Sequence, residues 1–191
     1  MKKIFLVLLL AIFILPCAFS NSESFFTTEV SLGTGISIYD SSSGDSRKSL
    51  LKESDLKRII IGTTAATNLN LSEPLKIILG AELFCDFLWK GSDYFNTTDY
   101  SLFSGIKIFP TRNGLNFSIS YVLGCRTDYF SAAPKKDTKS WGNGFRLALQ
   151  YDFMEDREYK VKPSAGVYYR CIPRGNYNKD HTLCLYGGIR F

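Results

Sequence analysis

Long segments in which apolar and polar residues alternate dominate this chain. In the clearest one, every odd-numbered residue from Leu75 to Trp89 is apolar, while Lys76, Glu82 and Asp86 fall between them. A period of two puts the two sets of side chains on opposite faces of a β-strand. The segment is far longer than an ordinary soluble strand of roughly 5–6 residues. It suits a tilted strand that crosses a membrane, which needs about 9–11 residues.

Seven further segments alternate in the same way, and the connections between segments are alternately long and short. The eight segments are 26–39, 56–69, 75–89, 99–109, 115–129, 141–153, 159–172 and 181–191. The short connections are 70–74, 110–114 and 154–158, and the longer polar ones are 40–55, 90–98, 130–140 and 173–180. Tight turns at one end and longer loops at the other are typical of outer-membrane barrels. The pattern therefore predicts an all-β fold, an eight-stranded antiparallel up-and-down transmembrane β-barrel.

Aromatic residues gather near both ends of the predicted strands. Membrane proteins place such residues at the two water–lipid interfaces, so two groups indicate two interfaces. The groups are Trp89, Tyr100, Tyr129 and Trp141 near the long connections, and Phe109, Phe153, Tyr159 and Phe191 near the short ones.

The N-terminus has the features of a secretory signal peptide. Two lysines precede an unbroken apolar run at 4–15, and small residues follow at 18–20. The run is too short for a membrane-spanning helix, which needs about 20 residues. We expect cleavage after residue 20, which makes 1–20 a signal peptide and 21–191 the barrel domain. An uncleaved anchor, or a lipid attached to Cys17, stays an alternative.

The net charge argues against one class of partner. The formal charge is only +5 at pH 7. A dedicated nucleic-acid binder usually concentrates Lys and Arg on one face of the molecule. We therefore expect no nucleic-acid partner.

Charged residues on the polar faces of the predicted strands would point into the barrel. Side chains can fill the space inside eight strands, and buried charges must be paired or hydrated. We expect a network that plugs and stiffens the barrel; the alternative is that the basic excess favours a small anion in the lumen. The predicted network comprises Glu82, Asp86 and Asp152 with Arg126, Arg146, Arg170 and Arg190, and the other basic residues on polar faces are Arg58, Lys76, Lys107, Lys160 and Lys162.

The C-terminal strand ends in an aromatic residue, Phe191, with Ile189 two positions before it. In these features and in its architecture the chain resembles the small eight-stranded bacterial outer-membrane proteins grouped with the OmpA transmembrane domain, OmpX and OmpW. In that class the barrel-assembly machinery reads the last strand, and a glycine often stands where this chain has Tyr186. Gly187 lies one place later, so we take Phe191, Ile189 and Gly187 as the assembly signal. An ordinary amphipathic last strand is the alternative.

The resemblance implies a location in the bacterial cell outer membrane. It also implies contacts with outer-membrane lipid, the barrel-assembly machinery and periplasmic chaperones.

A catalytic site is not evident. The chain has one histidine, His181, next to Asp180, and adjacent strand residues point to opposite faces. No serine accompanies His181 in a recognisable arrangement. We therefore predict no enzymatic activity, no catalytic residue, no cofactor and no metal.

Four cysteines follow the predicted cleavage site. An even number in an exported protein permits disulfides. The alternation puts Cys171 outward and Cys184 inward, which disfavours a bridge between them without a bulge. Free thiols that face lipid are the favoured interpretation, and disulfides stay open. The four are Cys85, Cys125, Cys171 and Cys184.

Four functions remain open, from different classes of protein. The favoured one is a non-enzymatic, membrane-structural protein whose loops at 40–55, 90–98, 130–140 and 173–180 bind external ligands or host surfaces. The second is a narrow channel for small or hydrophobic solutes. The third is a lipid-modifying enzyme that depends on His181. The fourth is a soluble periplasmic barrel of lipocalin-like shape, which requires an apolar interior and outward-facing charges.

Overall fold

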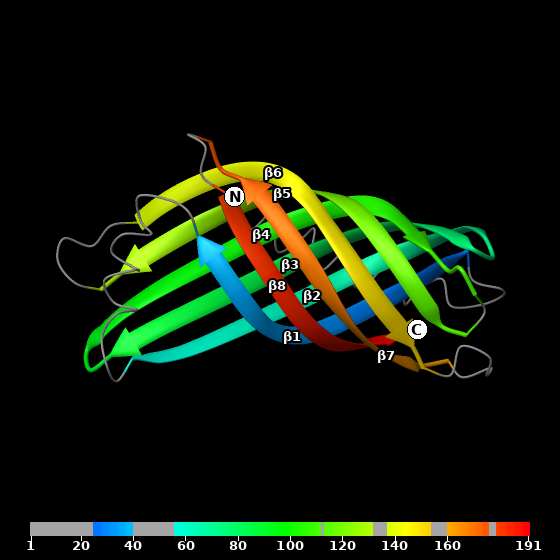
Figure 1. Ribbon diagram of the computed structural model, residues 1–191, viewed down its shortest axis with the longest axis horizontal. Helices are drawn as coiled ribbons and strands as arrows, with labels where there is room; N and C mark the ends of the chain where they lie inside the picture. Colours follow the sequence, from blue (N-terminus) through cyan, green and yellow to red (C-terminus); the bar gives the residue numbers. More distant parts are fainter. Residues whose placement is uncertain (1–24, 40–55, 112, 132–136, 154–159, 176–178) are drawn as a thin grey trace.

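The computed structural model describes residues 25–39, 56–111, 113–131, 137–153, 160–175 and 179–191. They form eight antiparallel strands that pair in chain order and close into one barrel (Figure 1). This confirms the predicted fold class. The strands are β1 (Phe26–Tyr39), β2 (Lys57–Ser72), β3 (Leu75–Lys90), β4 (Asp93–Ile108), β5 (Leu115–Phe130), β6 (Asp137–Asp152), β7 (Lys162–Pro173) and β8 (Lys179–Arg190).

The two ends of the barrel differ in their connections. The C-terminus and the turns β2–β3 and β4–β5 lie at the right-hand end of Figure 1, which we call the short-turn end. The opposite end, which we call the mouth, carries the β3–β4, β5–β6 and β7–β8 connections. No helix in the described part of the chain is long and apolar enough to cross a membrane.

The predicted loop at 90–98 is wrong. β3 and β4 pair up to Lys90↔Asp93, which leaves only Gly91 and Ser92 in the turn. Gly91 has a φ of 56°, and two-residue hairpins favour glycine in this left-handed region. The aromatic and β-branched residues before Asp99 suit a strand, so the hairpin continues where polar residues suggested a loop.

Two other long connections are shorter than predicted. β6 begins at Asp137, which pairs with Tyr129, so strand occupies part of the expected loop at 130–140. β7 ends at Pro173 and β8 begins at Lys179, so the connection between them is 174–178. The predicted loop at 40–55 lies outside the described residues, as do the signal peptide and Tyr159.

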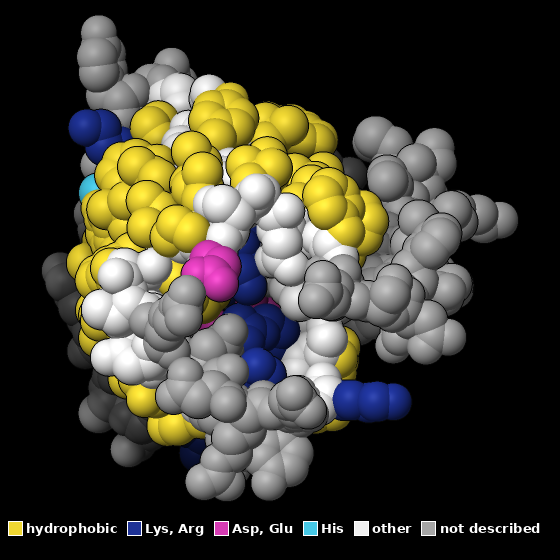
Figure 2. Space-filling model, turned by 90° about the vertical axis from the view of Figure 1, so that its right-hand side faces the viewer, with side chains coloured by type: hydrophobic (Ala, Val, Ile, Leu, Met, Phe, Trp, Pro, Cys, Tyr) yellow, Lys and Arg dark blue, Asp and Glu magenta, His cyan; other side chains and the backbone are white. Residues whose placement is uncertain are grey.

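The outer wall is apolar and the interior is polar, the reverse of a soluble barrel. Leu32 is 61% exposed and Leu185 66% exposed, whereas Glu82 is 2% exposed. From the short-turn end, Lys and Arg side chains are seen in the middle of the barrel, and hydrophobic side chains cover the outer wall (Figure 2). The lipocalin-like alternative requires charges that face outward, and the inward carboxylates contradict it.

One member of the predicted aromatic groups is misplaced. Phe109 is only 8% exposed, and Lys76 Nζ lies 4.5 Å from its ring centroid. Odd-numbered residues of β4 face inward, and Phe109 directly follows the last residue of β4, so the same alternation places Phe109 on the inner face. Near the mouth, Trp141 is 63% exposed, and the rings of Tyr94 and Tyr129 stack 5.6 Å apart on the strands β4 and β5.

Candidate functional site

A continuous network of ion pairs begins near the mouth of the barrel. Arg126 donates to Asp180 (2.5 Å) and also pairs with Asp128 (3.1 Å). Arg174 Nε donates to the second oxygen of Asp180 at 2.7 Å, and Arg174 Nη2 pairs with Asp99. Each of these carboxylates is buried, so the pairs are shielded from water.

The network continues to the centre of the barrel through Arg170. Its Nη2 lies 3.3 Å from Asp99, and its Nη1 lies 3.0 Å from Glu82. Arg170 Nη1 also donates to Ser101 Oγ at 2.8 Å. Arg170 is 1% exposed, and its guanidinium lies 5.5 Å from the ring of Phe84. Thus β7 is joined to β3 and β4 across the lumen.

Glu82 lies near the inner end of the network, where it contacts Arg170, Tyr168 and Arg146. Tyr168 donates its hydroxyl to Glu82 at 2.9 Å, and Arg146 Nε lies 3.6 Å away on the other oxygen. The Arg146 guanidinium lies 4.3 Å from the centroid of the Tyr168 ring and 4.9 Å from that of Phe103. Two large rings and two arginines therefore fill the lumen around one carboxylate.

Two smaller groups occupy the half nearer the short-turn end. Lys107 donates to Glu29 at 2.5 Å, and Asn68 donates to the same oxygen at 2.9 Å. Arg190 donates to Asp152 at 2.6 Å. A cavity of about 20 Å³, lined by Arg146, Gln150 and Tyr186 among others, lies between these groups and the centre. It is large enough for about one water molecule.

The pattern on the polar faces located most of these charges but not their partners. The structure brings Glu82 together with Arg146 and Arg170, and Asp152 with Arg190, whereas Asp86 pairs with Arg58. Sequence reasoning omitted five members: Glu29, Asp99, Asp128, Arg174 and Asp180. Position on the inward face would have found Glu29, Asp99 and Asp128, but Arg174 and Asp180 fell in a predicted loop.

The omitted carboxylates change the charge balance of the lumen. In the continuous network, four arginines meet four carboxylates, so the basic excess expected from the sequence is neutralised there. The members are Arg126, Arg146, Arg170 and Arg174 with Glu82, Asp99, Asp128 and Asp180.

Two strand joints, which we call seams, have ladders that stop short of the mouth. The β1–β2 ladder ends at Gly33↔Gly62, although both strands continue, and Figure 1 shows β1 and β2 running apart toward the mouth. The β6–β7 ladder ends at Phe145↔Cys171. Backbone groups without ladder partners need other partners inside a membrane.

Arginine side chains supply hydrogen bonds at both seams. Arg58 Nη2 donates to the Ser37 carbonyl at 3.2 Å while the same guanidinium holds Asp86 at 2.8 and 3.0 Å. Arg174 Nη1 donates to the carbonyls of Gly124 and Ser140 at 2.8 and 3.1 Å. Each seam is therefore tied by a side chain that also neutralises an inner carboxylate.

His181 and Asp180 point to opposite faces of the wall. Asp180 is buried against Arg126, whereas His181 Nδ1 lies 2.7 Å from the Tyr169 hydroxyl and its ring stacks on that of Tyr169. Among the described residues, no three His, Cys, Asp or Glu side chains are grouped closely enough to hold a metal ion.

The four cysteines after the predicted cleavage site are free thiols. Cys184 packs inside the barrel with Ala148, Tyr168 and Tyr186. Cys171 lies on the opposite face of the wall, beside His181 in the β7–β8 register.

The residues of the predicted assembly signal share the outward face of the last strand. Ile189 and Phe191 are exposed, and Gly187 lies on the same face. The backbones of Phe191 and Thr28 exchange two hydrogen bonds of 2.9 Å, which join the last residue to β1 at the short-turn end. The role of these residues in assembly stays a prediction.

Comparison with known proteins identifies the fold. No protein-family model matches the chain, and no curated protein matches its sequence. The crystal structure of Ail, the attachment invasion locus protein of Yersinia pestis, is 13% identical with a TM-score of 0.59, covering 88% of this chain and 100% of that one. A structure of Ail with the heparin analogue sucrose octasulfate matches at 12% identity and a TM-score of 0.53, with the same coverage.

Neisserial surface protein A is 14% identical, with a TM-score of 0.51 over 87% of this chain and 96% of that one. At these identities the likeness concerns the fold. The resemblance to small eight-stranded outer-membrane barrels, inferred from the sequence, is thus confirmed at that level.

Proposed function

We propose that this protein is an integral barrel of the bacterial outer membrane that is not an enzyme. Its role is structural in the membrane, with loops at the mouth that bind external ligands. The apolar outer wall supports insertion in lipid, because contact of the exposed leucine and isoleucine side chains with lipid is favourable, whereas their contact with water is unfavourable. The observation that carries the structural role is the continuous arginine–carboxylate network across the lumen.

The network favours a plug over an open channel. A permeating ion would have to pass between Arg170 and the two carboxylates that hold it, at 3.0 and 3.3 Å. Removing one partner from such a buried pair typically lowers the free energy of unfolding by about 3–5 kcal/mol, because the other charge stays buried without its partner. The neutral balance of the network also leaves little net charge to attract a small anion.

Conductance across a planar lipid bilayer tests the plug directly. We expect purified, refolded protein to give no steady single-channel current in 1 M KCl. Reproducible current steps from the wild-type chain would contradict the plug and support the alternative, a narrow channel for small or hydrophobic solutes.

Gel mobility tests the membrane location independently. A folded barrel from purified outer membrane should run differently before and after boiling. Recovery in the soluble periplasmic fraction, without a shift, would contradict insertion. N-terminal sequencing of the same sample tests cleavage after residue 20.

External binding is proposed for the predicted loop segments 40–55, 130–140 and 173–180, although the last two include residues of β5 and β6 and of β7 and β8. The turn at Gly91 and Ser92 offers little surface for this role. One structural neighbour, Ail, was crystallised with a heparin analogue. Because the segment 130–140 contains Lys135, Lys136 and Lys139, a sulfated polysaccharide is a suitable first ligand to test. Immobilised heparin should retain the wild type and release a triple Lys→Gln variant at lower salt; equal elution would contradict this ligand.

The absence of enzymatic activity is also part of the proposal. His181 donates to, or accepts from, the outward hydroxyl of Tyr169 rather than a carboxylate. If the barrel modifies lipid, a His181→Ala variant should lose that activity in an assay of outer-membrane lipids. We expect wild type and variant to leave the same lipids unchanged.

A further inference from the structure

The ion pairs of the continuous network form one chain in which carboxylates and arginines alternate. The chain starts near the mouth at Asp128 and ends in the interior at Arg146. Its order is Asp128, Arg126, Asp180, Arg174, Asp99, Arg170, Glu82 and Arg146. Every member except the first and the last lies between two opposite charges. The network is therefore neutral as a whole, whereas its inner end is a cation.

Arg146 is held less closely by its carboxylate than the other arginines of this chain are. Its Nε lies 3.6 Å from Glu82, which is too far for a hydrogen bond. Glu82 is closer to two other donors, Arg170 Nη1 at 3.0 Å and the Tyr168 hydroxyl at 2.9 Å. Arg146 is 4% exposed, and its Nε has no hydrogen-bond partner among the described residues. A buried cation with an open donor is costly, so this side chain favours a further anionic partner.

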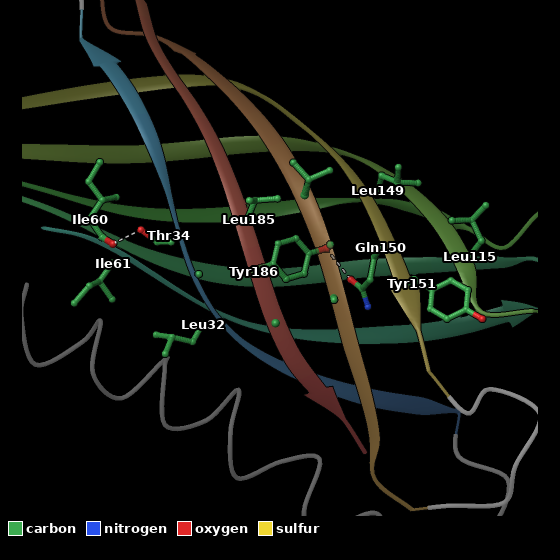
Figure 3. Close-up of a pocket in the computed structure, with 15 residues that line it drawn as sticks. Leu32, Thr34, Ile60, Ile61, Leu115, Leu149, Gln150, Tyr151, Leu185 and Tyr186 are labelled. Carbon is green, nitrogen blue, oxygen red and sulfur yellow. Dashed lines mark hydrogen bonds between the residues drawn. The ribbon is translucent and has the colours of Figure 1, made fainter.

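The small cavity of about 20 Å³ lies against Arg146, between the centre of the barrel and the short-turn end. Gln150 and Tyr186 line it but are bound to each other, because Tyr186 donates its hydroxyl to Gln150 Oε1 at 2.9 Å (Figure 3). Inward residues with hydroxyl groups also line the cavity, and they are Ser31, Thr64, Ser118 and Ser164. The space therefore fits one water molecule or one small ion, next to donors that can bind it.

The charges around the cavity favour an anion over water. Glu29 lines the cavity, and its Oε1 accepts from Lys107 at 2.5 Å and from Asn68 at 2.9 Å. Asp152 is bound by Arg190 at 2.6 Å. Each of these carboxylates has a cation of its own, whereas Arg146 shares Glu82 with Arg170. From the short-turn end, Figure 2 shows Lys and Arg side chains in the middle of the barrel, and such a basic approach attracts anions.

We propose that this cavity binds one chloride ion next to Arg146. The inference goes beyond the structural role of the barrel. Chloride is little larger than a water molecule, so it fits the space, whereas sulfate and phosphate do not. It gives Arg146 the second opposite charge that each other arginine of the chain already has, and it accepts hydrogen bonds from the surrounding donors. An ion held in this way is part of the plug and does not require conduction through the lumen.

The dependence of stability on chloride tests the site. Urea unfolding in detergent micelles is compared in sodium chloride and in sodium gluconate at the same ionic strength, because gluconate is too large for the cavity. We expect 1 M chloride to lower the unfolding equilibrium constant of the wild type about tenfold relative to gluconate, as a ligand with a dissociation constant of about 0.1 M does. Equal unfolding constants in the two salts would overturn the proposal.

Two variants and a matched control separate the site from general effects of salt. Arg146→Met removes the charge, and Ser118→Leu fills the cavity while it keeps Arg146. Ser104→Leu makes the same change at an exposed outward residue of β4. We expect Ser104→Leu to keep the chloride effect of the wild type, and the other two variants to lose most of it. The same chloride effect in all four proteins would overturn the proposal.

Bromide distinguishes the ion from water directly. Crystals of the wild type grown in sodium bromide should show an anomalous scattering peak within hydrogen-bond distance of the Arg146 guanidinium. Electron density at that position without an anomalous signal would identify water and overturn the proposal.

Discussion

Replacing Arg170 with methionine tests whether the ion-pair network stabilises the barrel. Methionine keeps most of the length of the side chain but removes the charge. The change breaks the contacts of Arg170 with Glu82 at 3.0 Å, Asp99 at 3.3 Å and Ser101 at 2.8 Å. All four residues are buried, so water does not compensate the lost contacts.

The size of the effect follows from the partners that stay behind. Leaving a buried charge without its partner costs about 3–5 kcal/mol. Asp99 retains Arg174, and Glu82 retains Arg146 and the Tyr168 hydroxyl. We therefore expect a loss of about 3 kcal/mol in the free energy of unfolding, at the lower end of that range.

Reversible urea unfolding in lipid vesicles, followed by tryptophan fluorescence, measures this loss. Lys57→Met is the control, since Lys57 is exposed, and it should change stability by less than about 0.5 kcal/mol. The double variant Glu82→Gln, Arg170→Met should cost less than the two single changes together, because the pair is coupled. A cost below about 1 kcal/mol for Arg170→Met, the value of an exposed pair, would refute the stabilising role of the network.

Three further predictions concern the seam, one close approach and the thiols. Arg58→Gln should lower stability by about 1–2 kcal/mol in the same urea assay, less than Arg170→Met, because its side chain is 28% exposed; a larger loss than that of Arg170→Met would contradict the ranking. Gly105→Ala should prevent the mobility shift on boiling, because its Cβ would collide with the Ile119 carbonyl, whereas Gly187→Ala should preserve the shift when refolded in detergent. If the thiols of Cys85, Cys125, Cys171 and Cys184 are free, the unfolded mature chain should take up four alkyl groups without prior reduction, and a lower number would indicate a disulfide.

Alternation in the sequence was sufficient to predict the architecture, since it identifies the face of each strand. In β3 the pattern is unbroken, and the predicted segment at 75–89 differs from the observed strand by one residue. It was insufficient at the start of β4, which lies at the mouth, because polar residues such as Asn96 and Thr97 occupy strand positions there.

The partners of the lumen charges were beyond the reach of the pattern. The alternation of apolar and polar residues tells which face of its strand a residue occupies. It does not tell the position of that residue along the barrel axis relative to strands on the other side of the lumen. Glu82 on β3 meets Arg170 on β7, and no local signal connects positions so far apart in the chain. Arg174 lies just after a strand, where alternation has ended, so its two carboxylate partners could not be inferred.

The two seams have a mechanical consequence. The joint between the first and last strands has eleven register pairs, from Glu29↔Arg190 to Tyr39↔Asp180, whereas the β1–β2 and β6–β7 joints have eight each. The first and last strands therefore share a longer ladder than β1 shares with β2 or β6 with β7. Toward the mouth, β1 keeps its pairing with β8 after its ladder with β2 has ended. We therefore expect an outward force at the mouth to separate β1 from β2 before it separates β1 from β8.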